Sequence, residues 1–304
     1  GDQVTYFNGQ PIDQAIGAVN CPFDGPFSTE FARRYQQARY LLRAPEGTPA
    51  TLTFINAAYQ EQTQTLTAAR ESASFFVTSL YINYDSTALP VESQILTEDI
   101  GYIRVNSNYD DLNLVLRLFE RALQTFKDNQ LSAVIIDLRL NSGGSPLGLA
   151  GYFTINPIPL AQLEYYSEKT GRFEPEGTTA QVYPFQNQYR FEKMALLVDQ
   201  GCFSACEIEA YAFSQLPDIL VVGQYPTAGV EAEVARGQFH LPETMTLQVP
   251  TGRYTLPDGS LFLEGSGVAP TLRVPIDRQN VLSDEDVVLQ AAIQAFNLND
   301  STPQ

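Results

Sequence analysis

The sequence predicts an α/β fold, because apolar runs of strand length alternate with segments that read as helices. The apolar runs are residues 132–139, 192–199 and 219–223, the kind of strand that a parallel sheet buries on both faces. Residues 110–129 carry leucines at three- and four-residue spacing, and residues 204–216 read as a second helix. Strand, helix, strand, helix, strand indicates a mostly parallel sheet with right-handed crossovers.

The first 75 residues predict a separate, β-rich unit. The alternating run DQVTYFNG ends in an Asn-Gly turn signal, and a segment of helical spacing at 28–42 follows it. Two further alternations, TLTFINAA and TQTLTAAR, are typical of strands. We therefore expect three parts: the unit at 1–75, a linker at 76–99 and a core at 100–304.

The remaining stretches follow the same patterns. Residues 74–84 read as extended and apolar, and residues 85–98 as polar and irregular. Within the core, the sequence further predicts a strand at 100–105, a helix that begins with SPLGLAGYF, hairpins over 234–263 and a closing helix at 284–296.

Composition excludes several classes of partner. The chain has 304 residues, is 44% apolar and has a formal net charge of −17, so it is an ordered globular protein that repels nucleic-acid phosphates and anionic lipid. No run approaches the ~20 apolar residues that span a bilayer, and the start of the chain has no leader pattern. We expect a soluble, extracytoplasmic protein, periplasmic or secreted, and the sequence predicts no particular oligomeric state.

Three cysteines, Cys21, Cys202 and Cys206, give neither a disulfide framework nor a zinc pattern. Cys202 and Cys206 flank Ser204 at two residues on either side, where a bridge is possible but would strain the turn. We expect free, buried thiols.

Two loops that follow apolar strands carry residues suited to catalysis. In LNSGGS, Gly143 and Gly144 let the backbone turn sharply and point bare N–H groups outward, which suits an oxyanion; an ordinary Gly-Gly turn is the alternative. In DQGCFSACE, Ser204 lies among small residues on a strand-to-helix turn, like a nucleophile elbow, although serine is also a favoured helix cap. Because such loops meet at one edge of a parallel sheet, together they favour a catalytic site.

The chain resembles the S41 serine peptidases, the carboxyl-terminal processing and tricorn-like proteases, almost from end to end. The segments that carry the resemblance occur in the family's order: GDQVTYFNGQPIDQAI, LLRAPEGTPATLTF, IGYIRVNSNYDD, AVIIDLRLNSGG, GCFSACEIEAYAF, VVGQYPTAG and YTLPDGSLFLEGSGVAPTLRV. The resemblance implies a crotonase-like catalytic core preceded by a PDZ-like module whose opening strand is missing from this sequence.

The resemblance also implies a function: a serine endopeptidase that acts on peptides or unfolded proteins without a metal or an organic cofactor. Ser204 would be the nucleophile, and Gly143, Gly144 and the Ala205 N–H would form the oxyanion hole. The PDZ-like module would bind a substrate tail by strand addition. Asp137 and Arg139 beside the glycines are either an ion pair or a grip on substrate, and we expect a structural role for Asp137.

The base departs from the family pattern. Processing proteases have a lysine directly after Thr-x-Gly, and here Val230 stands in that place. Lys193, at the far end of a strand, is a poor substitute. The tricorn-like branch uses a Ser-His-Glu triad, in which Glu264 matches the carboxylate and the histidine would precede Gly1. His240, the single histidine, is the rival base, but its place on an expected hairpin favours a structural or exposed role.

Two further readings remain open. The absent lysine and histidine favour a catalytically inactive relative that binds peptides or hydrophobic ligands, whereas Ser204, the glycine loop and Glu264 together favour an enzyme. A third reading is one fragment of a processed protease whose other piece supplies the base.

Overall fold

The computed structural model describes residues 2–21, 28–71, 73–74, 78, 87–109, 111–234 and 236–299. Apart from residues 74 and 78, the extended stretch expected at 74–84 lies outside the described residues.

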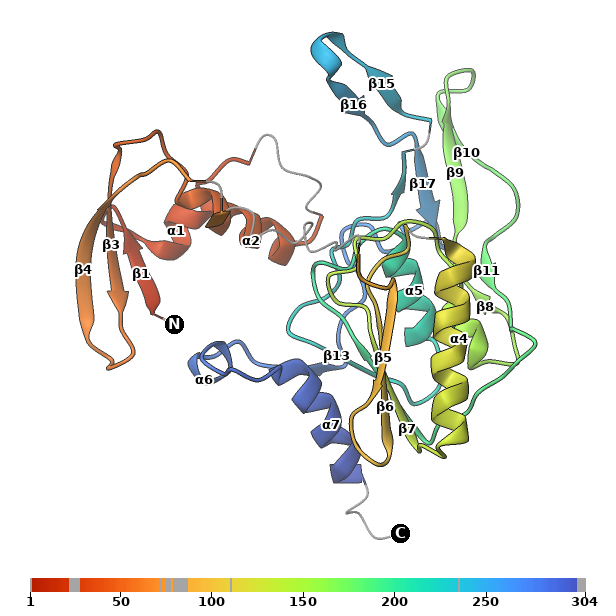
Figure 1. Ribbon diagram of the computed structural model, residues 1–304. Coiled ribbons are helices and arrows are strands. Elements are labelled where there is room, and N and C mark those ends of the chain that lie inside the picture. Colours follow the sequence, from red (N-terminus) through yellow and green to blue (C-terminus); the bar gives the residue numbers. More distant parts are fainter. Residues whose placement is uncertain are drawn as a thin grey trace.

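A six-stranded sheet forms the centre of the molecule, in the order β18-β13-β12-β7-β6-β5 (Figure 1). All neighbours in it run parallel except β5 and β6. The predicted α/β class and the parallel arrangement of the three apolar strands are therefore confirmed. The strands are β5 (Val91–Ile95), β6 (Ile100–Val105), β7 (Ala133–Asp137), β12 (Lys193–Leu197), β13 (Leu220–Gly223) and β18 (Leu272–Arg273).

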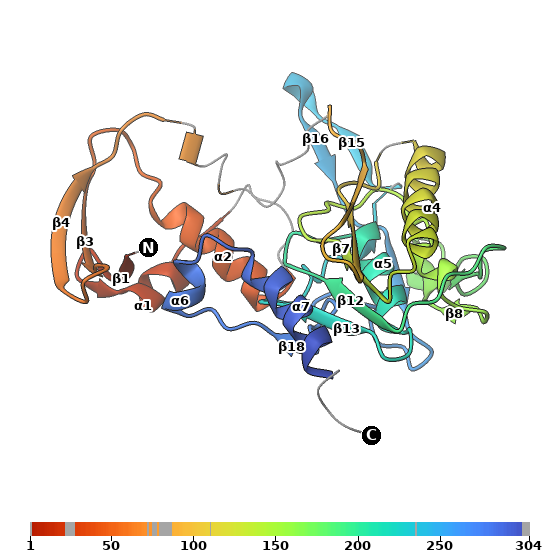
Figure 2. The ribbon, with the colours of Figure 1, turned by 60° about the horizontal axis from the view of Figure 1, so that its bottom comes forward.

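Helices cover both faces of this sheet, which is why its central strands β7 and β12 are largely apolar. α4 (Leu112–Asp128) and α5 (Ala205–Ser214) pack on the face that carries Val134 and Ile136 of β7. α7 (Val287–Asn299) packs on the other face, against Ala133 and Ile135 (Figures 1 and 2). The two predicted helices therefore share one face, and the closing helix covers the other.

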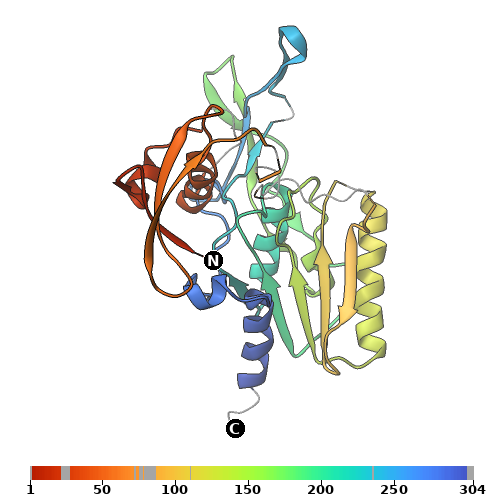
Figure 3. The ribbon, with the colours of Figure 1, turned by 60° about the vertical axis from the view of Figure 1, so that its left-hand side comes forward.

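The N-terminal part forms its own antiparallel sheet, in the order β2-β1-β3-β4, beside the core (Figure 3). Its helix α2 begins at a threonine cap, because Thr29 Oγ1 accepts a hydrogen bond of 3.2 Å from the Ala32 N–H. The start of α2 reaches the core, where the Phe31 ring lies 5.3 Å from the Tyr225 ring. The elements are β1 (Gln3–Phe7), β2 (Gln10–Pro11), α1 (Ile12–Gly17), α2 (Glu30–Leu41), β3 (Pro49–Ile55) and β4 (Glu61–Thr67).

A second antiparallel sheet, β10-β9-β17-β14, lies above the strand ends of the central sheet (Figure 1). A two-stranded hairpin, β15–β16, projects beyond it (Figures 1 and 3). The elements of this region are β8 (Ile158–Pro159), β9 (Gln162–Ser167), β10 (Arg172–Pro175), β11 (Gln181–Val182), β14 (Ala232–Glu233), β15 (Gln238–His240), η2 (Pro242–Thr244), β16 (Thr246–Gln248) and β17 (Gly252–Thr255); the short helix α6 (Arg278–Val281) precedes α7.

Three expectations need correction. The polar stretch expected to be irregular contains β5, an edge strand whose exposed face explains its polarity. SPLGLAGYF forms the short 3₁₀ helix η1 (Leu149–Tyr152) rather than a longer helix. Of the hairpins expected over 234–263, β15–β16 forms and Thr255 makes an antiparallel bridge with Leu261, but β17 pairs as a strand with β9 and β14.

None of the described helices is both long enough and apolar enough to cross a membrane.

A buried ion pair ties the sheet to α7. Arg139 Nη2 lies 2.6 Å from Asp137 Oδ2 and 2.6 Å from Asp286 Oδ2. Asp137 is fully buried and also accepts the Tyr102 hydroxyl at 2.7 Å, so its carboxylate is enclosed by donors. The sequence left two interpretations of Asp137 and Arg139, an ion pair or a grip on substrate. These contacts fit the ion pair, because Arg139 binds two carboxylates of the protein.

Replacing Arg139 by methionine should destabilise the protein by about 3 kcal/mol, because it leaves the Asp137 charge buried without its partner. Urea unfolding measures this difference. Arg34→Met is the matched control, because it breaks an exposed ion pair with Asp13 and should change little. Equal stability of the two variants would contradict the role assigned to Arg139.

Candidate active site

The register of the central sheet brings the two candidate loops together. Leu197 of β12 pairs with Asp137 of β7, so both strands end at the same level. The loop after β7 carries the glycine pair, and the loop after β12 leads into Ser204 and α5. One hydrogen bond joins the loops, because Asp199 Oδ1 accepts the Leu140 N–H of the first loop at 3.0 Å; the same oxygen accepts the Gly201 N–H of its own loop at 2.9 Å.

Ser204 has an unusual backbone conformation, with φ 57° and ψ −131°. This left-handed conformation is rare for a residue other than glycine and typical of a sharp strand-to-helix turn. Its N–H donates to the Val230 carbonyl at 3.0 Å. Although Ser204 stands at the cap position of α5, its side chain makes no capping hydrogen bond. The simple helix-cap interpretation is therefore wrong for this serine.

The glycine loop lies directly against Ser204. A Cβ at Gly143 would stand 2.6 Å from the Phe203 carbonyl oxygen and 3.0 Å from Ser204 Cβ. A Cβ at Gly144 would stand 2.3 Å from the Asn108 carbonyl oxygen. Both glycines have positive φ, 84° and 129°. Glycine is required at both positions by close approach as well as by conformation.

The N–H groups near Ser204 differ in availability. The Gly143 N–H already donates to Asn141 Oδ1 at 2.9 Å. The N–H groups of Gly144 and Ala205 have no acceptor in the described part of the chain. Of the three donors predicted for the oxyanion hole, two are therefore available, and Gly143 serves the close packing of the loop.

Asn141 and Asn108 hold the glycine loop in place, and the sequence analysis assigned neither a role. Asn141 is fully buried and donates to Asn108 Oδ1 at 2.7 Å and to the Val105 carbonyl at 3.1 Å. Asn108 in turn donates to the Ser145 carbonyl at 3.1 Å. The asparagine within LNSGGS was the available signal, but its partners become apparent only in the fold.

Cys202 and Cys206 form a disulfide across the Ser204 turn, so the prediction of free thiols is wrong. Their Cα atoms are 5.4 Å apart, within the ordinary range for a bridge. The first turn of α5 carries Cys206 back toward Cys202. Both residues are fully buried.

Alkylation after unfolding should therefore block one thiol, that of Cys21, without reductant and three thiols after reduction. Mass spectrometry of the alkylated chain gives the count. Three thiols blocked without reductant would contradict the bridge.

Glu207, on the first turn of α5, holds the loop that follows β13. Its carboxylate accepts the Thr227 hydroxyl at 2.5 Å, the Gly229 N–H at 2.8 Å and the Val230 N–H at 2.6 Å. Burial is the largest influence on this group and raises its pKa to about 7, although the hydrogen bonds oppose that rise. Since the Val230 carbonyl binds the Ser204 N–H, Glu207 fixes the backbone that supports Ser204.

The raised pKa of Glu207 makes stability depend on pH. The folded protein binds this proton more tightly than the unfolded chain, so the contribution is fully present below about pH 4.5 and is lost as pH rises through about 7. Glu207→Gln removes this dependence. The stability of the wild type relative to this variant should therefore fall between pH 5 and pH 8 by up to ~3 kcal/mol.

Chemical unfolding at the two pH values measures the change. Glu98→Gln, at an exposed position, is the control and should follow the wild type. A Glu207→Gln variant with the pH dependence of the wild type would contradict the assignment.

Glu264 lies close to the Ser204 support. Its Oε2 accepts the Glu231 N–H at 2.8 Å, and Glu231 is the residue after Val230. Its Oε1 accepts the hydroxyl of Ser28, from the N-terminal part. Glu231 is itself buried, and burial raises the pKa of its carboxyl well above the usual value, with the carboxylates of Glu207 and Glu264 adding to the rise. The structure thus brings Glu264 to the same segment that contacts Ser204.

His240 lies elsewhere. It is exposed on β15 and pairs through its backbone with Thr246. The hairpin that carries it projects from the core, away from α5 (Figure 1). The described contacts of the Ser204 backbone come from the loops around it and from α5, with none from β15. Lys193 is also remote, because its Nζ donates to the Phe296 carbonyl at 2.7 Å, at the opposite end of the strand.

Comparison with known proteins identifies the family of the chain. The model of peptidase family S41 matches residues 99–274, more than half of the chain, and the chain therefore belongs to peptidase family S41. The resemblance seen in the motifs is confirmed.

One relative is the carboxyl-terminal-processing peptidase 2, chloroplastic, of Arabidopsis thaliana, and the chain is 27% identical to it over 262 residues. The match covers 82% of this chain and 44% of that protein, so the chain spans less than half of its relative's length.

Two solved structures share the fold. Mature CPAF has a TM-score of 0.66 at 15% identity, and the match covers 99% of this chain and 78% of CPAF. A putative peptidase from Parabacteroides merdae ATCC 43184 has a TM-score of 0.56 at 17% identity, with coverage of 91% and 86%.

Proposed function

We propose that the protein is a serine endopeptidase that cleaves peptides or unfolded proteins through Ser204. The observation that carries the proposal is the Ser204 turn, with its uncapped side chain and positive φ, set against two N–H groups without acceptors. A binding protein has no use for a serine held in this way. The core would be of the crotonase-like kind.

In this mechanism the Ser204 Oγ attacks the carbonyl carbon of the scissile peptide, and a base takes the Oγ proton. As the Oγ–C bond forms, an electron pair moves onto the carbonyl oxygen. The N–H groups of Ala205 and Gly144 donate hydrogen bonds to the resulting oxyanion, and the positive end of the α5 dipole stabilises it further. The base then gives its proton to the leaving amine, and water releases the acyl group by the same steps.

For the base, we favour a histidine that precedes Gly1, oriented by the Glu264 carboxylate. Glu264 suits this role because it is half-buried, lies beside the Ser204 support and has oxygen lone pairs beyond those that Ser28 and Glu231 use. Val230 contributes its backbone and cannot accept a proton through its side chain. His240 on the projecting hairpin is the less favoured base.

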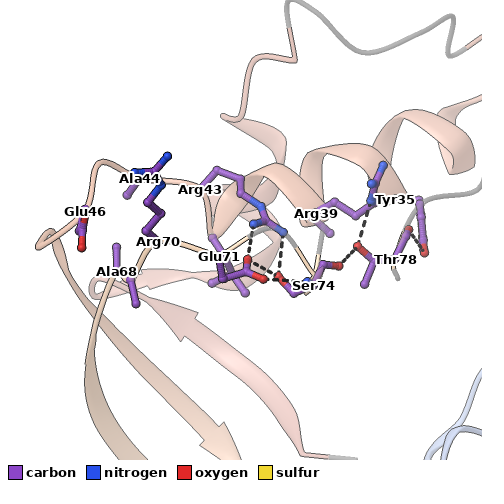
Figure 4. Close-up of a pocket in the computed structure, with 13 residues that line it drawn as sticks. Tyr35, Arg39, Arg43, Ala44, Glu46, Ala68, Arg70, Glu71, Ser74 and Thr78 are labelled. Atoms are coloured by element: carbon purple, nitrogen blue, oxygen red, sulfur yellow. Dashed lines mark hydrogen bonds and ion pairs between the residues drawn. The ribbon is translucent and has the colours of Figure 1, made fainter. Parts of the chain in front are cut away.

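The N-terminal part would act as a PDZ-like module that receives a substrate tail. A cavity of about 890 Å³ between α2 and the segment after β4 supports this role. Figure 4 shows arginine side chains of α2 and of that segment around it, with Arg43 paired to Glu71. The boundaries that we propose are 1–75 for this module, 76–99 for the connection, which includes β5, and 100–304 for the catalytic core.

An extracytoplasmic location, periplasmic or secreted, fits the Cys202–Cys206 bridge, because disulfides persist in oxidising compartments.

A fluorophosphonate probe should label Ser204 in the full-length protein, and Ser204→Ala should abolish both labelling and peptide cleavage. Glu264→Gln should lower kcat/KM on the order of 10³-fold, because a neutral amide no longer stabilises the imidazolium. His240→Ala should change little. Labelling is read by mass spectrometry and cleavage by release from a fluorogenic peptide.

If Ser204 stays unlabelled in well-folded full-length protein, the endopeptidase function is contradicted. Loss of labelling in His240→Ala, with Glu264→Gln active, would transfer the role of base to His240.

One observation favours a second function, a catalytically inactive protein that binds peptides or hydrophobic ligands. Among the described residues, Lys193 donates to the Phe296 carbonyl and His240 is exposed on β15, so neither is placed as a base for Ser204, while the N-terminal cavity is large enough for a ligand. Turnover distinguishes the two functions. A peptide-binding protein would retain its affinity for peptide in the Ser204→Ala variant, and its full-length wild type would show no Ser204-dependent cleavage.

A further inference from the structure

The β15–β16 hairpin is amphipathic across its two faces. Register pairs set Phe239 opposite Leu247, and the Leu241 N–H donates to the Met245 carbonyl. Alternate residues of a strand point to opposite faces, so the large apolar side chains share one face. That apolar face consists of Phe239, Leu241, Met245, Leu247 and Val249. The polar face consists of Gln238, His240, Thr246 and Gln248.

The apolar face has no partner in the described protein. Its five side chains are between 39% and 53% exposed, although each is of a type that proteins usually bury. A two-stranded hairpin is at best marginally stable in water, and contiguous exposed apolar patches on a monomer are often functional. The face therefore has the properties of a binding surface.

The root of the hairpin is fixed to the second sheet. The Arg236 guanidinium lies 3.6 Å from the centre of the Tyr165 ring and pairs with Glu176. Gly237 packs so closely on the Val249 carbonyl that a Cβ there would stand 1.7 Å from its oxygen. The outer edges of β15 and β16 are unpaired in the described part of the chain. The arm is thus anchored at its base and open along its length.

We propose that this apolar face is a docking surface for an extended, uncharged, apolar segment of the substrate, outside the cleavage site. The inference rests on the proposed peptidase function and adds the substrate class. β14 joins the arm to the segment whose Val230 carbonyl binds the Ser204 N–H. The docking surface is therefore connected along the chain to the segment that supports Ser204.

The charges of the arm and of the whole chain indicate which kind of substrate segment the apolar face would bind. Residues 238–249 contain one formal charge, Glu243, in a chain of net charge −17. The arm therefore favours uncharged side chains, and the net negative charge of the chain disfavours acidic ones. The open strand edges offer N–H and C=O groups to the backbone of an added strand. An unfolded polypeptide supplies both features, whereas folded proteins bury them.

A second copy of this chain fits the face less well. With side-chain areas of about 150–200 Å² each, the exposed fractions leave roughly 400 Å² per copy, about half of the ~800 Å² per partner that specific interfaces bury. Two copies that each carry a charge of −17 would also repel one another.

The experiment measures peptide binding to full-length protein with Ser204→Ala, so that cleavage does not interfere. The probe is a fluorescent peptide of about fifteen residues in which leucine and valine alternate with serine and threonine. Phe239→Thr with Leu247→Thr should weaken binding about tenfold, because two partly buried side chains are lost. Gln238→Thr with Gln248→Thr, the neighbouring register pair on the polar face, should stay within twofold.

Circular dichroism checks that both variants fold. On the active background, the apolar-face variant should raise KM for the long apolar peptide and leave cleavage of a short peptide unchanged. If the full-length wild type binds the peptide through the apolar face but does not cleave it, the docking surface is supported and the peptidase function is contradicted. Failure of the docking surface and failure of the peptidase function therefore give different results. Equal binding by both variants overturns the docking surface. The docking surface is also overturned if the apolar-face substitutions leave peptide binding unchanged but abolish a concentration-dependent dimer. The same holds if they leave peptide binding unchanged but abolish adsorption to phosphatidylcholine vesicles.

Discussion

The backbone of Ser204 is held in a conformation that serine rarely adopts, and much of the core is arranged around that turn. A left-handed conformation of this kind costs about 1–3 kcal/mol and persists only where its surroundings impose it. Here the Val230 carbonyl binds the Ser204 N–H, Gly143 closes the space beside the side chain, and a disulfide joins the residues two positions before and after. Each of these contacts comes from a different loop, and all of the loops leave the same edge of the parallel sheet.

Buried carboxylates hold those loops, and this shapes the electrostatics of the site. Asp199 joins the loop after β7 to the loop after β12, and Glu207 joins α5 to the loop after β13. Glu264 and Glu231 lie next to them, and the neighbouring carboxylates raise the pKa of Glu231 further. A carboxylate at Glu264 would stabilise a protonated imidazole, which is the state that a histidine base reaches after it takes the serine proton.

The parts that could be predicted from sequence are those set by local patterns. The apolar runs located β7, β12 and β13, and the Gly-Gly and Ser204 turns marked the edge where the loops meet. The strand β5 was missed because an edge strand with an exposed face resembles a loop in composition. β9 and β10 were not predicted, although they pair with each other as a local hairpin; only the pairing of β9 with β17 is distant in sequence.

The contacts within the site were harder to predict for the same reason. The roles of Asn141 and Glu207 depend on backbone N–H groups that only the folded loops bring within reach. The Cys202–Cys206 bridge depends on a Cα separation that spacing alone does not determine. The amphipathic pattern of 238–249 was legible in the sequence, whereas the absence of a covering element became apparent only from the described fold.

The most direct test of the account is a crystal structure of the full-length protein after reaction with a peptide aldehyde. The account predicts a hemiacetal on Ser204 Oγ whose oxygen lies about 2.7–3.1 Å from the N–H groups of Ala205 and Gly144, with a histidine between Ser204 and Glu264. An aldehyde left unreacted in the site, or a hemiacetal oxygen directed away from both N–H groups, would contradict it.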